Sequence, residues 1–206
     1  MNYLNMNNVF FEPWKGENYK SGGIFNKKIL VLGESQYGVK DVDKKPSATI
    51  ERVLHVVSGD REKWTGTYRR FERSLVGHYT SDEESKEIWN SVVFYNYVQK
   101  SLSDTDVDPS EDATEEELKQ WEDAFFEVLE NEKYQPDLII GWGKRLCNMM
   151  PGELGNDIRV EGQREYAKTC VYELKNHKRI LSIWVNHPSK YYSWSKWYRI
   201  MLQVLK

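Results

Sequence analysis

The chain is poor in cysteine and has no long apolar run. Its only cysteines, Cys147 and Cys170, are too few for a disulfide scaffold or a four-cysteine zinc or iron–sulfur site. No apolar segment approaches the roughly 20 residues of a membrane-spanning helix, and the first residues lack the features of a secretory signal. We therefore expect one domain, residues 1–206, that is a cytoplasmic monomer without membrane contact, metal or cofactor.

The net charge of −3 conceals an uneven distribution of charge along the chain. Residues 101–135 contain 13 acidic and 2 basic side chains, whereas residues 138–206 contain 12 basic and 5 acidic ones. An excess of basic residues in the last third suits a polyanionic ligand such as DNA. The alternative is a chance excess on a solvated surface, and charge alone does not separate the two.

Four apolar runs predict the strands of a parallel sheet. These runs are apolar throughout rather than alternating, which is typical of strands covered on both faces. They are KILVLG (28–33), SVVFYNYV (91–98), PDLIIGWG (136–143) and RILSIWVNHP (179–188). A further strand at 169–176 is expected at the edge of the sheet, in a hairpin with the last run.

Helical patterns separate the apolar runs. We expect helices within 47–59, 61–79, 82–92, 114–134, the residues between Gly143 and Pro151, and 192–206. The helix at 114–134 opens with a capping box formed by Thr114 and Glu117. Alternating strands and helices predict a three-layer α/β/α domain around a central, mainly parallel, four-stranded sheet with one possible extra edge strand.

The carboxyl ends of the parallel strands carry the unusual polar residues. In open α/β sheets ligands bind at these ends, so GESQYG, NYVQ, GWGKR and NHPSKYYS are expected at one rim. The spacing of residues in GESQYG does not match a dinucleotide-binding loop, a phosphate loop or a nucleophile elbow. Asn96 within an apolar run is unusual, because a buried carboxamide needs partners for its donors and its acceptor. It either satisfies them internally or binds a ligand with a matching edge, such as a nucleobase.

Taken in order, the four rim segments resemble the uracil-DNA glycosylase superfamily. GESQYG stands in the place of its first motif, VVFYNYVQ resembles its base-reading strand, LIIGWGKRL its tryptophan–glycine strand end, and HPSKYYS its H-P-S loop. The resemblance spans roughly residues 28–195 but depends on about two dozen of them. It implies the sheet of that superfamily and an enzyme that flips uracil or a modified base into a pocket and hydrolyses its N-glycosidic bond.

The resemblance also implies roles for individual residues. Asn96 would read the Watson–Crick edge of the base, and His187 would donate to the base carbonyl as negative charge develops on the leaving base. Tyr37 would limit what fits, and the backbone after Gly33 would orient the attacking water. An aromatic side chain from the second strand would stack on the base. Tyr95 is the named candidate, and Phe94 and Tyr97 are alternatives. DNA would contact Lys144, Ser189, Lys190, Tyr191 and Tyr192, with one tyrosine wedged into the duplex.

The first motif departs from the best-known members of the superfamily. Where they carry the aspartate that positions the attacking water, this chain has Ser35, whose hydroxyl cannot take up a proton. Glu34 lies one residue earlier and is the other candidate for this catalytic role. The open outcomes are a uracil enzyme of modest rate, an enzyme for another base, or a catalytically weak or inactive binder of nucleic acid or modified bases.

ILVLGES also resembles the first block of GDSL-type hydrolases. Ser35 would then be a nucleophile and His187 its base. That family places an aspartate three residues before the histidine, where this chain has Trp184, and its middle block G-x-N-D is absent. This alternative is the weaker of the two enzyme hypotheses.

Overall fold

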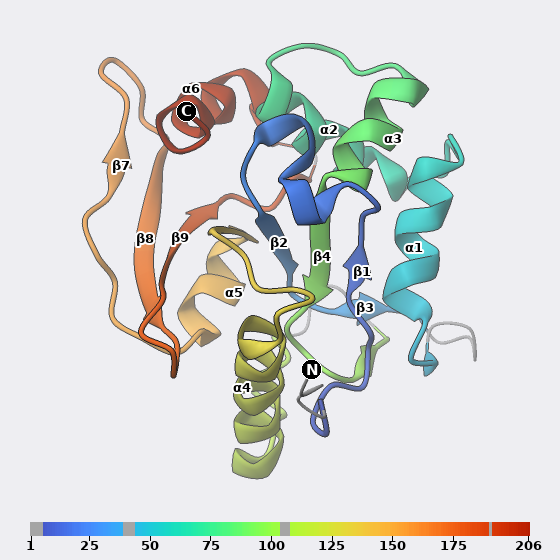
Figure 1. Ribbon diagram of the computed structural model, residues 1–206, viewed down its shortest axis with the longest axis vertical. Coiled ribbons are helices and arrows are strands. Elements are labelled where there is room, and N and C mark those ends of the chain that lie inside the picture. The colour runs from blue at the N-terminus through green and yellow to red at the C-terminus, as the bar shows by residue number, and fades with distance from the viewer. Residues whose placement is uncertain (1–5, 39–43, 104–107, 190) are drawn as a thin grey trace.

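The structure is a computed structural model that describes residues 6–38, 44–103, 108–189 and 191–206. Within these residues one sheet contains seven strands in the order β1-β4-β2-β6-β9-β8-β7 (Figure 1). Its four central strands run parallel and are β4 (Val92–Asn96), β2 (Ile29–Gly33), β6 (Leu138–Trp142) and β9 (Arg179–Val185). Every residue of β2, β4 and β6 is buried, as their uninterrupted apolar sequences predict.

Antiparallel strands extend the sheet on both sides. β1 (Trp14–Lys15) pairs with β4, β8 (Tyr166–Glu173) with β9, and β7 (Ile158–Arg159) with β8. The predicted extra strand is therefore present as β8, but the expected four-stranded sheet was too small. β1 and β7 are only two residues long, and so short a segment has no hydrophobic period to detect. A separate parallel pair, β3 (Gln36–Tyr37) and β5 (Ser101–Leu102), lies beyond β2 and β4.

Helices cover both faces of the sheet. One face packs against α1 (Ala48–Val57), α2 (Thr65–Val76), α3 (Asp82–Asn90) and α6 (Trp194–Val204), and the other against α4 (Glu115–Glu130) and α5 (Lys144–Met149). Two 3-10 turns precede β2 at Tyr19–Ser21 and Gly23–Phe25. The expected α/β/α layering is present. No helix of the described chain has the length and apolar character needed to cross a membrane.

The capping box predicted for α4 is present. Glu117 N donates to Thr114 Oγ1 at 3.2 Å, and Thr114 N donates to Glu117 Oε2 at 2.9 Å. Two amides at the helix start thereby gain acceptors that the helix itself does not supply. α3 begins in the same way with Ser81 and Glu84.

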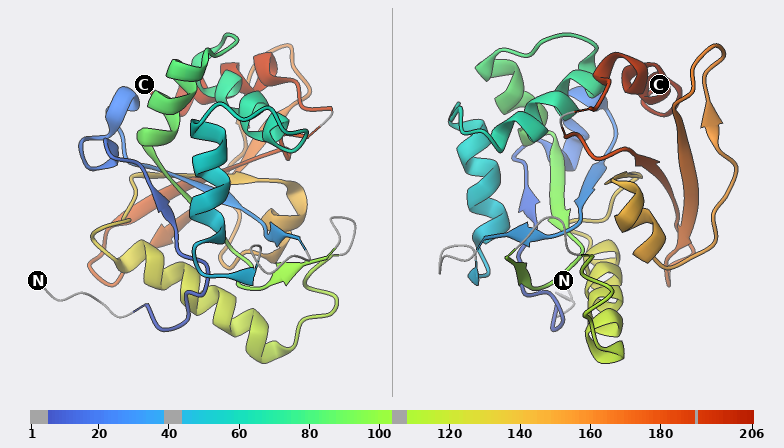
Figure 2. Two further views of the ribbon diagram at one scale, coloured as in Figure 1. Left: turned by 90° about the vertical axis from the view of Figure 1, so that its right-hand side faces the viewer. Right: turned by 180° about the vertical axis from the view of Figure 1, so that it is seen from behind.

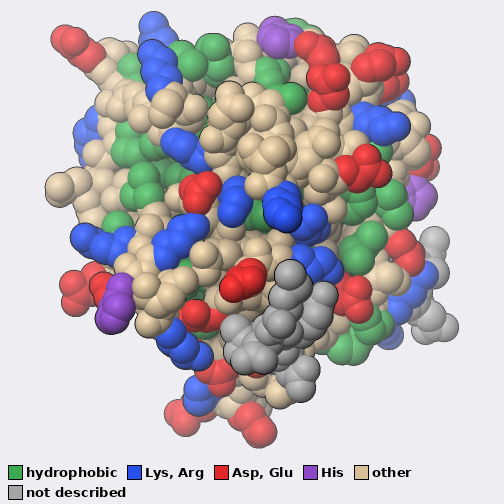
Figure 3. All heavy atoms as spheres, in the orientation of Figure 1, with side chains coloured by type: hydrophobic (Ala, Val, Ile, Leu, Met, Phe, Trp, Pro, Cys, Tyr) green, Lys and Arg blue, Asp and Glu red, His purple; other side chains and the backbone are tan. Residues whose placement is uncertain are grey.

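The uneven charge along the sequence does not produce a single charged patch on the face shown in Figure 3. Lys and Arg side chains are mixed with Asp and Glu across the face shown in Figure 3. In the basic segment, Lys178 pairs at 2.8 Å with Asp137, which lies two residues beyond the acidic segment. This pair balances one charge of the basic segment.

The chain reverses its direction of travel across the sheet at β2. The second parallel strand, β4, lies on one side of β2, and the third, β6, lies on the other. Such a reversal leaves a crevice at the carboxyl ends of the two strands where the connections diverge. In the right-hand view of Figure 2, α5, the segment after β9 and α2 surround this end of the sheet.

Candidate nucleobase-binding site

A cavity of about 950 Å³ opens at the carboxyl ends of the parallel strands. Most of the residues expected at the rim line it: Gly33, Glu34, Ser35, Tyr37, Asn96, Lys144, His187, Ser189, Tyr191 and Tyr192. It is also lined by Trp142 and Arg145 of the expected rim segment GWGKR, and by Arg52, Trp64 and Tyr68, for which the sequence predicted no contact with the base. Its volume lies near the upper end of the roughly 300–1,000 Å³ typical of ligand pockets, so a base with its sugar can enter.

Glu34 is held by two side chains at the floor of the crevice. Arg145 Nε donates to Glu34 Oε1 at 2.6 Å, and Arg145 Nη2 donates to Glu34 Oε2. The Tyr37 hydroxyl also donates to Oε2 and receives a bond of 3.0 Å from Arg145 Nη2. Both carboxylate oxygens are thus occupied by charge-assisted hydrogen bonds, the strong class.

The pKa values of the two partners follow from this arrangement. Burial, and then the hydrogen bond to the Glu34 carboxylate, raise the pKa of Tyr37 above its usual value, so the phenol stays protonated. The hydrogen bond to Glu34 raises the pKa of Arg145 above its usual value. The Glu34 side chain is only 9% exposed. Because it is bound by a cation and a phenol, Glu34 does not present a free carboxylate, contrary to its expected use as a catalytic group.

Ser35 does not supply the missing group either. Its Oγ is buried and has no hydrogen-bond partner among the described residues. It is therefore not hydrogen-bonded to His187, as a nucleophile activated by that histidine would be. Trp184, three residues before His187, is a buried core residue that cannot orient the imidazole as an aspartate would.

Asn96 ends β4 beside Gly33, its register partner at the end of β2. Asn96 Nδ2 donates to Thr49 Oγ1 on α1 at 3.3 Å, and in the described chain no donor reaches Oδ1. A Cβ atom at Gly33 would lie 2.5 Å from Asn96 Oδ1, so only glycine leaves room for the carboxamide there. One acceptor and one amide hydrogen of a 4% exposed side chain thus remain for a ligand.

His187 lies on the opposite wall, in the segment that follows β9. Its ring meets the edge of Trp142 at 6.2 Å between centroids. The residue keeps exposed surface, but loss of hydration around the imidazole lowers its pKa. The Glu34 carboxylate raises this pKa, whereas the charges of Arg145 and Arg70 lower it further. The imidazole is therefore neutral at pH 7 and offers one N–H donor.

Aromatic rings form the remaining wall. Phe94 lies 5.3 Å from Trp142 and 5.5 Å from Tyr68, measured between ring centroids. Tyr95, expected to stack on the base, instead points to the other face of the sheet and is fully buried against α4. Adjacent strand residues point to opposite faces, so the stacking position belongs to Phe94 rather than Tyr95.

The residues expected to contact DNA have different environments. Tyr191 is 90% exposed at the mouth of the cavity, and Lys144 and Ser189 are also exposed there. Tyr192 is only 7% exposed, because its ring stacks on Trp197 at 5.9 Å and its hydroxyl bonds to Ser74 Oγ. Tyr192 is thus a packing residue, not a surface contact. Lys190 lies outside the described residues.

The structure offers no metal site in the part of the chain that it describes. No three His, Cys, Asp or Glu side chains there are grouped to hold an ion. No protein-family model matches the chain, and no curated protein matches it.

Proposed function

We propose that this protein is a DNA glycosylase-like enzyme that takes uracil or a modified base into the cavity and hydrolyses its N-glycosidic bond. The observation that carries the proposal is the convergence of Asn96 and His187 on one aromatic-walled cavity at the sheet's point of reversal. A base-reading amide and a neutral donor on opposite walls are two of the groups that the reaction needs, beside the attacking water. The resemblance of the four rim segments supports the same conclusion.

Recognition would depend on Asn96. Its free Oδ1 accepts from the N3–H of a uracil-type base, while its second amide hydrogen donates to the adjacent carbonyl oxygen. Thr49 and Gly33 hold the carboxamide in place. Phe94 supplies an aromatic face beside the base, and the base gains stacking energy there after it leaves the DNA stack.

Bond cleavage would depend on His187. As the glycosidic bond breaks, negative charge moves onto the base, and the neutral imidazole donates a hydrogen bond to the base carbonyl that becomes the oxyanion. Water supplies a hydroxyl to C1′ of the sugar, and its proton ends on the released base. The charge of a protonated histidine is not needed for this step.

The first motif limits the rate. Both oxygens of Glu34 accept hydrogen bonds from Arg145, and Ser35 Oγ is buried, so neither side chain offers a free base to the attacking water. General base catalysis contributes typically 10²–10⁴-fold, so we expect turnover that is slower than that of a comparable enzyme with a free carboxylate. The same observation favours a second candidate, a protein that binds a flipped base without cleaving it.

The test is an activity screen with short oligonucleotides, each carrying uracil or one modified base. After incubation and treatment with alkali, strand breaks at the marked base support the glycosylase. Retention of the marked oligonucleotide without breaks supports the binder. Hydrolysis of p-nitrophenyl esters that is lost in Ser35→Ala would support the hydrolase instead.

A further inference from the structure

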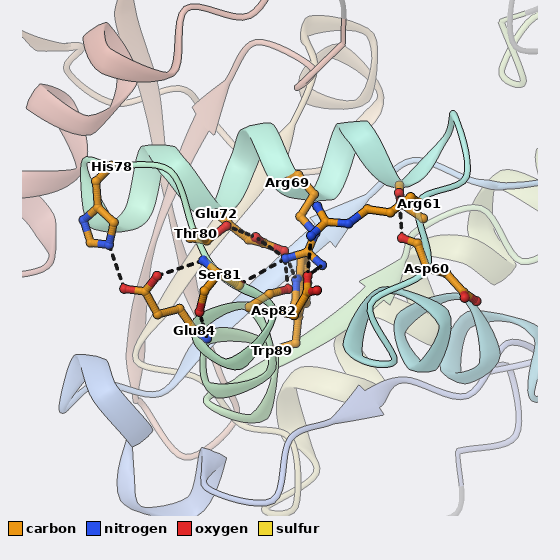
Figure 4. A network of polar contacts seen from close by, with 12 residues as sticks. Asp60, Arg61, Arg69, Glu72, His78, Thr80, Ser81, Asp82, Glu84 and Trp89 are labelled. Atoms are coloured by element: carbon orange, nitrogen blue, oxygen red, sulfur yellow. Dashed lines mark hydrogen bonds and ion pairs between the residues drawn. The ribbon is translucent and has the colours of Figure 1, made fainter.

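Helix α2 carries arginines in two electrostatic settings. On its face toward α3, Arg69 is paired with two carboxylates: Nη2 donates to Asp82 Oδ1 at 2.6 Å, and Glu72 lies 3.5 Å away (Figure 4). Glu72 also accepts hydrogen bonds from Thr80, Ser85 and Trp89. The charge of Arg69 is thus balanced by two carboxylates, as in a structural ion pair, although its Nε is buried without an acceptor.

Arg70 and Arg73 are not matched in this way. Arg70 Nε donates to the backbone oxygen of Pro188 at 2.9 Å, next to His187. Burial, and then the charge of Arg73 nearby, lower the pKa of Arg70. Neither arginine has a carboxylate within ion-pair distance among the described residues, and Arg73 Nε is buried without an acceptor. Two like charges one helical turn apart oppose helix stability, so this pair is more readily explained by an anionic ligand than by folding.

Aromatic rings continue from these arginines, exposed at Tyr79 and Tyr191 and half-buried at Trp194. The guanidinium carbon of Arg73 lies 4.1 Å from the ring centroid of Tyr79, whose surface is 69% exposed. Tyr79 meets the edge of Trp194 at 5.8 Å between centroids, and the exposed Tyr191 lies three residues before Trp194. We call Arg70, Arg73, Tyr79, Tyr191 and Trp194 the α2–α6 strip. It borders the cavity through Pro188 and Tyr191.

We propose that the α2–α6 strip binds single-stranded DNA on one side of the base held in the cavity. That the cavity holds a base rests on the proposed function. The binding of DNA by the strip is inferred separately, from the contacts of the strip itself. Arginines pair with phosphates, and unpaired bases stack on exposed aromatic rings. In a duplex the bases are already stacked and paired, so they cannot use these rings. The strip therefore favours a single strand over a duplex.

The test measures the affinity of a labelled pyrimidine oligonucleotide of about 12 nucleotides, a length within the roughly 4–16 of single-strand sites, with no uracil or modified base. Fluorescence anisotropy compares single strand with duplex. We expect tighter binding of the single strand, a roughly tenfold loss in Tyr79→Ala, and near-normal affinity in Tyr79→Phe, which keeps the ring. Arg73→Gln should weaken binding and lower the slope of log affinity against log salt by about 1.

Arg159→Gln is the matched control. Arg159 also lies over a tyrosine ring, Tyr166, at 4.2 Å, but on β7 and β8. Its affinity should stay within about twofold of wild type. Equal affinity for duplex and single strand, or unchanged binding in both Tyr79→Ala and Arg73→Gln, would overturn the proposal. If binding depends on the strip but no base is cleaved, the inference about the strip is supported and the glycosylase proposal is overturned.

Discussion

Arg145 and Glu34, 111 positions apart in the sequence, form a bidentate ion pair at the point where the sheet reverses. Glu34 precedes Ser35, the position at which the resemblance places the catalytic aspartate of a glycosylase. The ion pair connects the loop after β2 to α5, the first helix after β6. The pair therefore stabilises the rim of the cavity and limits its chemistry.

Glu34→Gln tests whether this pair is structural. We expect a loss of about 1–3 kcal/mol in the free energy of unfolding, below the range for fully buried pairs because the Arg145 side chain is 31% exposed. The single-turnover rate should fall by less than about tenfold, since Glu34 supplies no free base. Urea unfolding and single-turnover cleavage measure the two effects.

Asp123→Asn is the control for that experiment, because its partner Lys119 is 73% exposed and surface pairs contribute little. Its unfolding free energy should change by less than about 0.5 kcal/mol. A hundredfold loss of rate in Glu34→Gln at unchanged stability would instead make Glu34 the base.

Gly33→Ala should displace Asn96. The new Cβ would lie 2.5 Å from Asn96 Oδ1 and 3.0 Å from Phe94 Cζ, too close for either to remain in place. Misplacement of about 1 Å can cost on the order of 100-fold in rate, and we expect a loss of that size. Gly66→Ala on α2 is the control, because its Cβ would meet only the end of the Arg70 side chain, at 3.4 Å. Equal rates in the two variants would contradict the role given to Asn96.

Asn96→Asp should change which base is preferred. A carboxylate only accepts hydrogen bonds, so it repels a uracil carbonyl and suits the amino group of cytosine. We expect the ratio of uracil to cytosine cleavage to fall about 100-fold, as for loss of a buried hydrogen bond that leaves repulsion in its place. Asn186→Asp adds the same charge at an exposed position of the same cavity and should leave that ratio unchanged.

The pH profile reports the protonation state of His187. Because its pKa is lowered below 6.5, the imidazole gains a proton only at a lower pH than an ordinary histidine does. The single-turnover rate should be constant from about pH 8 to about pH 6.5 and decline only below that range. A rate that increases as the pH falls past 6.5 would show that the protonated form is the active one.

Stability should depend on the same group. The unfolded chain binds a proton at His187 near pH 6.5, whereas the folded chain binds it only at lower pH, so the unfolded state holds more protons as the pH falls. The contribution of the neutral imidazole to stability is thus present above pH 6.5 and is lost below it. His187→Asn should remove this part of the acid-side decrease in urea midpoint.

Much of the fold could be predicted because its signals are local. The continuous apolar runs correspond to β2, β4, β6 and β9, and the Thr114–Glu117 capping box marks the start of α4. Convergence of the rim segments on one cavity follows from the parallel order, since the carboxyl ends of parallel strands meet at one edge. The short strands β1 and β7 form because they pair with β4 and β8, and their own two-residue sequences do not predict a strand.

The contacts within the cavity depend on long-range geometry. Arg145 directly follows the strand end GWGK, yet its pairing with Glu34 appears only when β2 and β6 lie side by side. In β4, which is buried on both faces, hydrophobicity does not tell Phe94 from Tyr95, so the sequence left both rings as candidates and named Tyr95 first. Tyr191 and Tyr192 are neighbours in the sequence, but only the packing of Trp197 separates the exposed ring from the buried one.

Release of free base is the most direct measurement of the central claim. A single-stranded oligonucleotide carrying one uracil or modified base is incubated with excess protein, and the free base and abasic strand are quantified by mass spectrometry. The account predicts release of at least one base by wild type and a rate lower by a factor of about 100 or more in His187→Ala, which has no donor for the leaving base. No release of any base by wild type, or equal release by the two proteins, would contradict it.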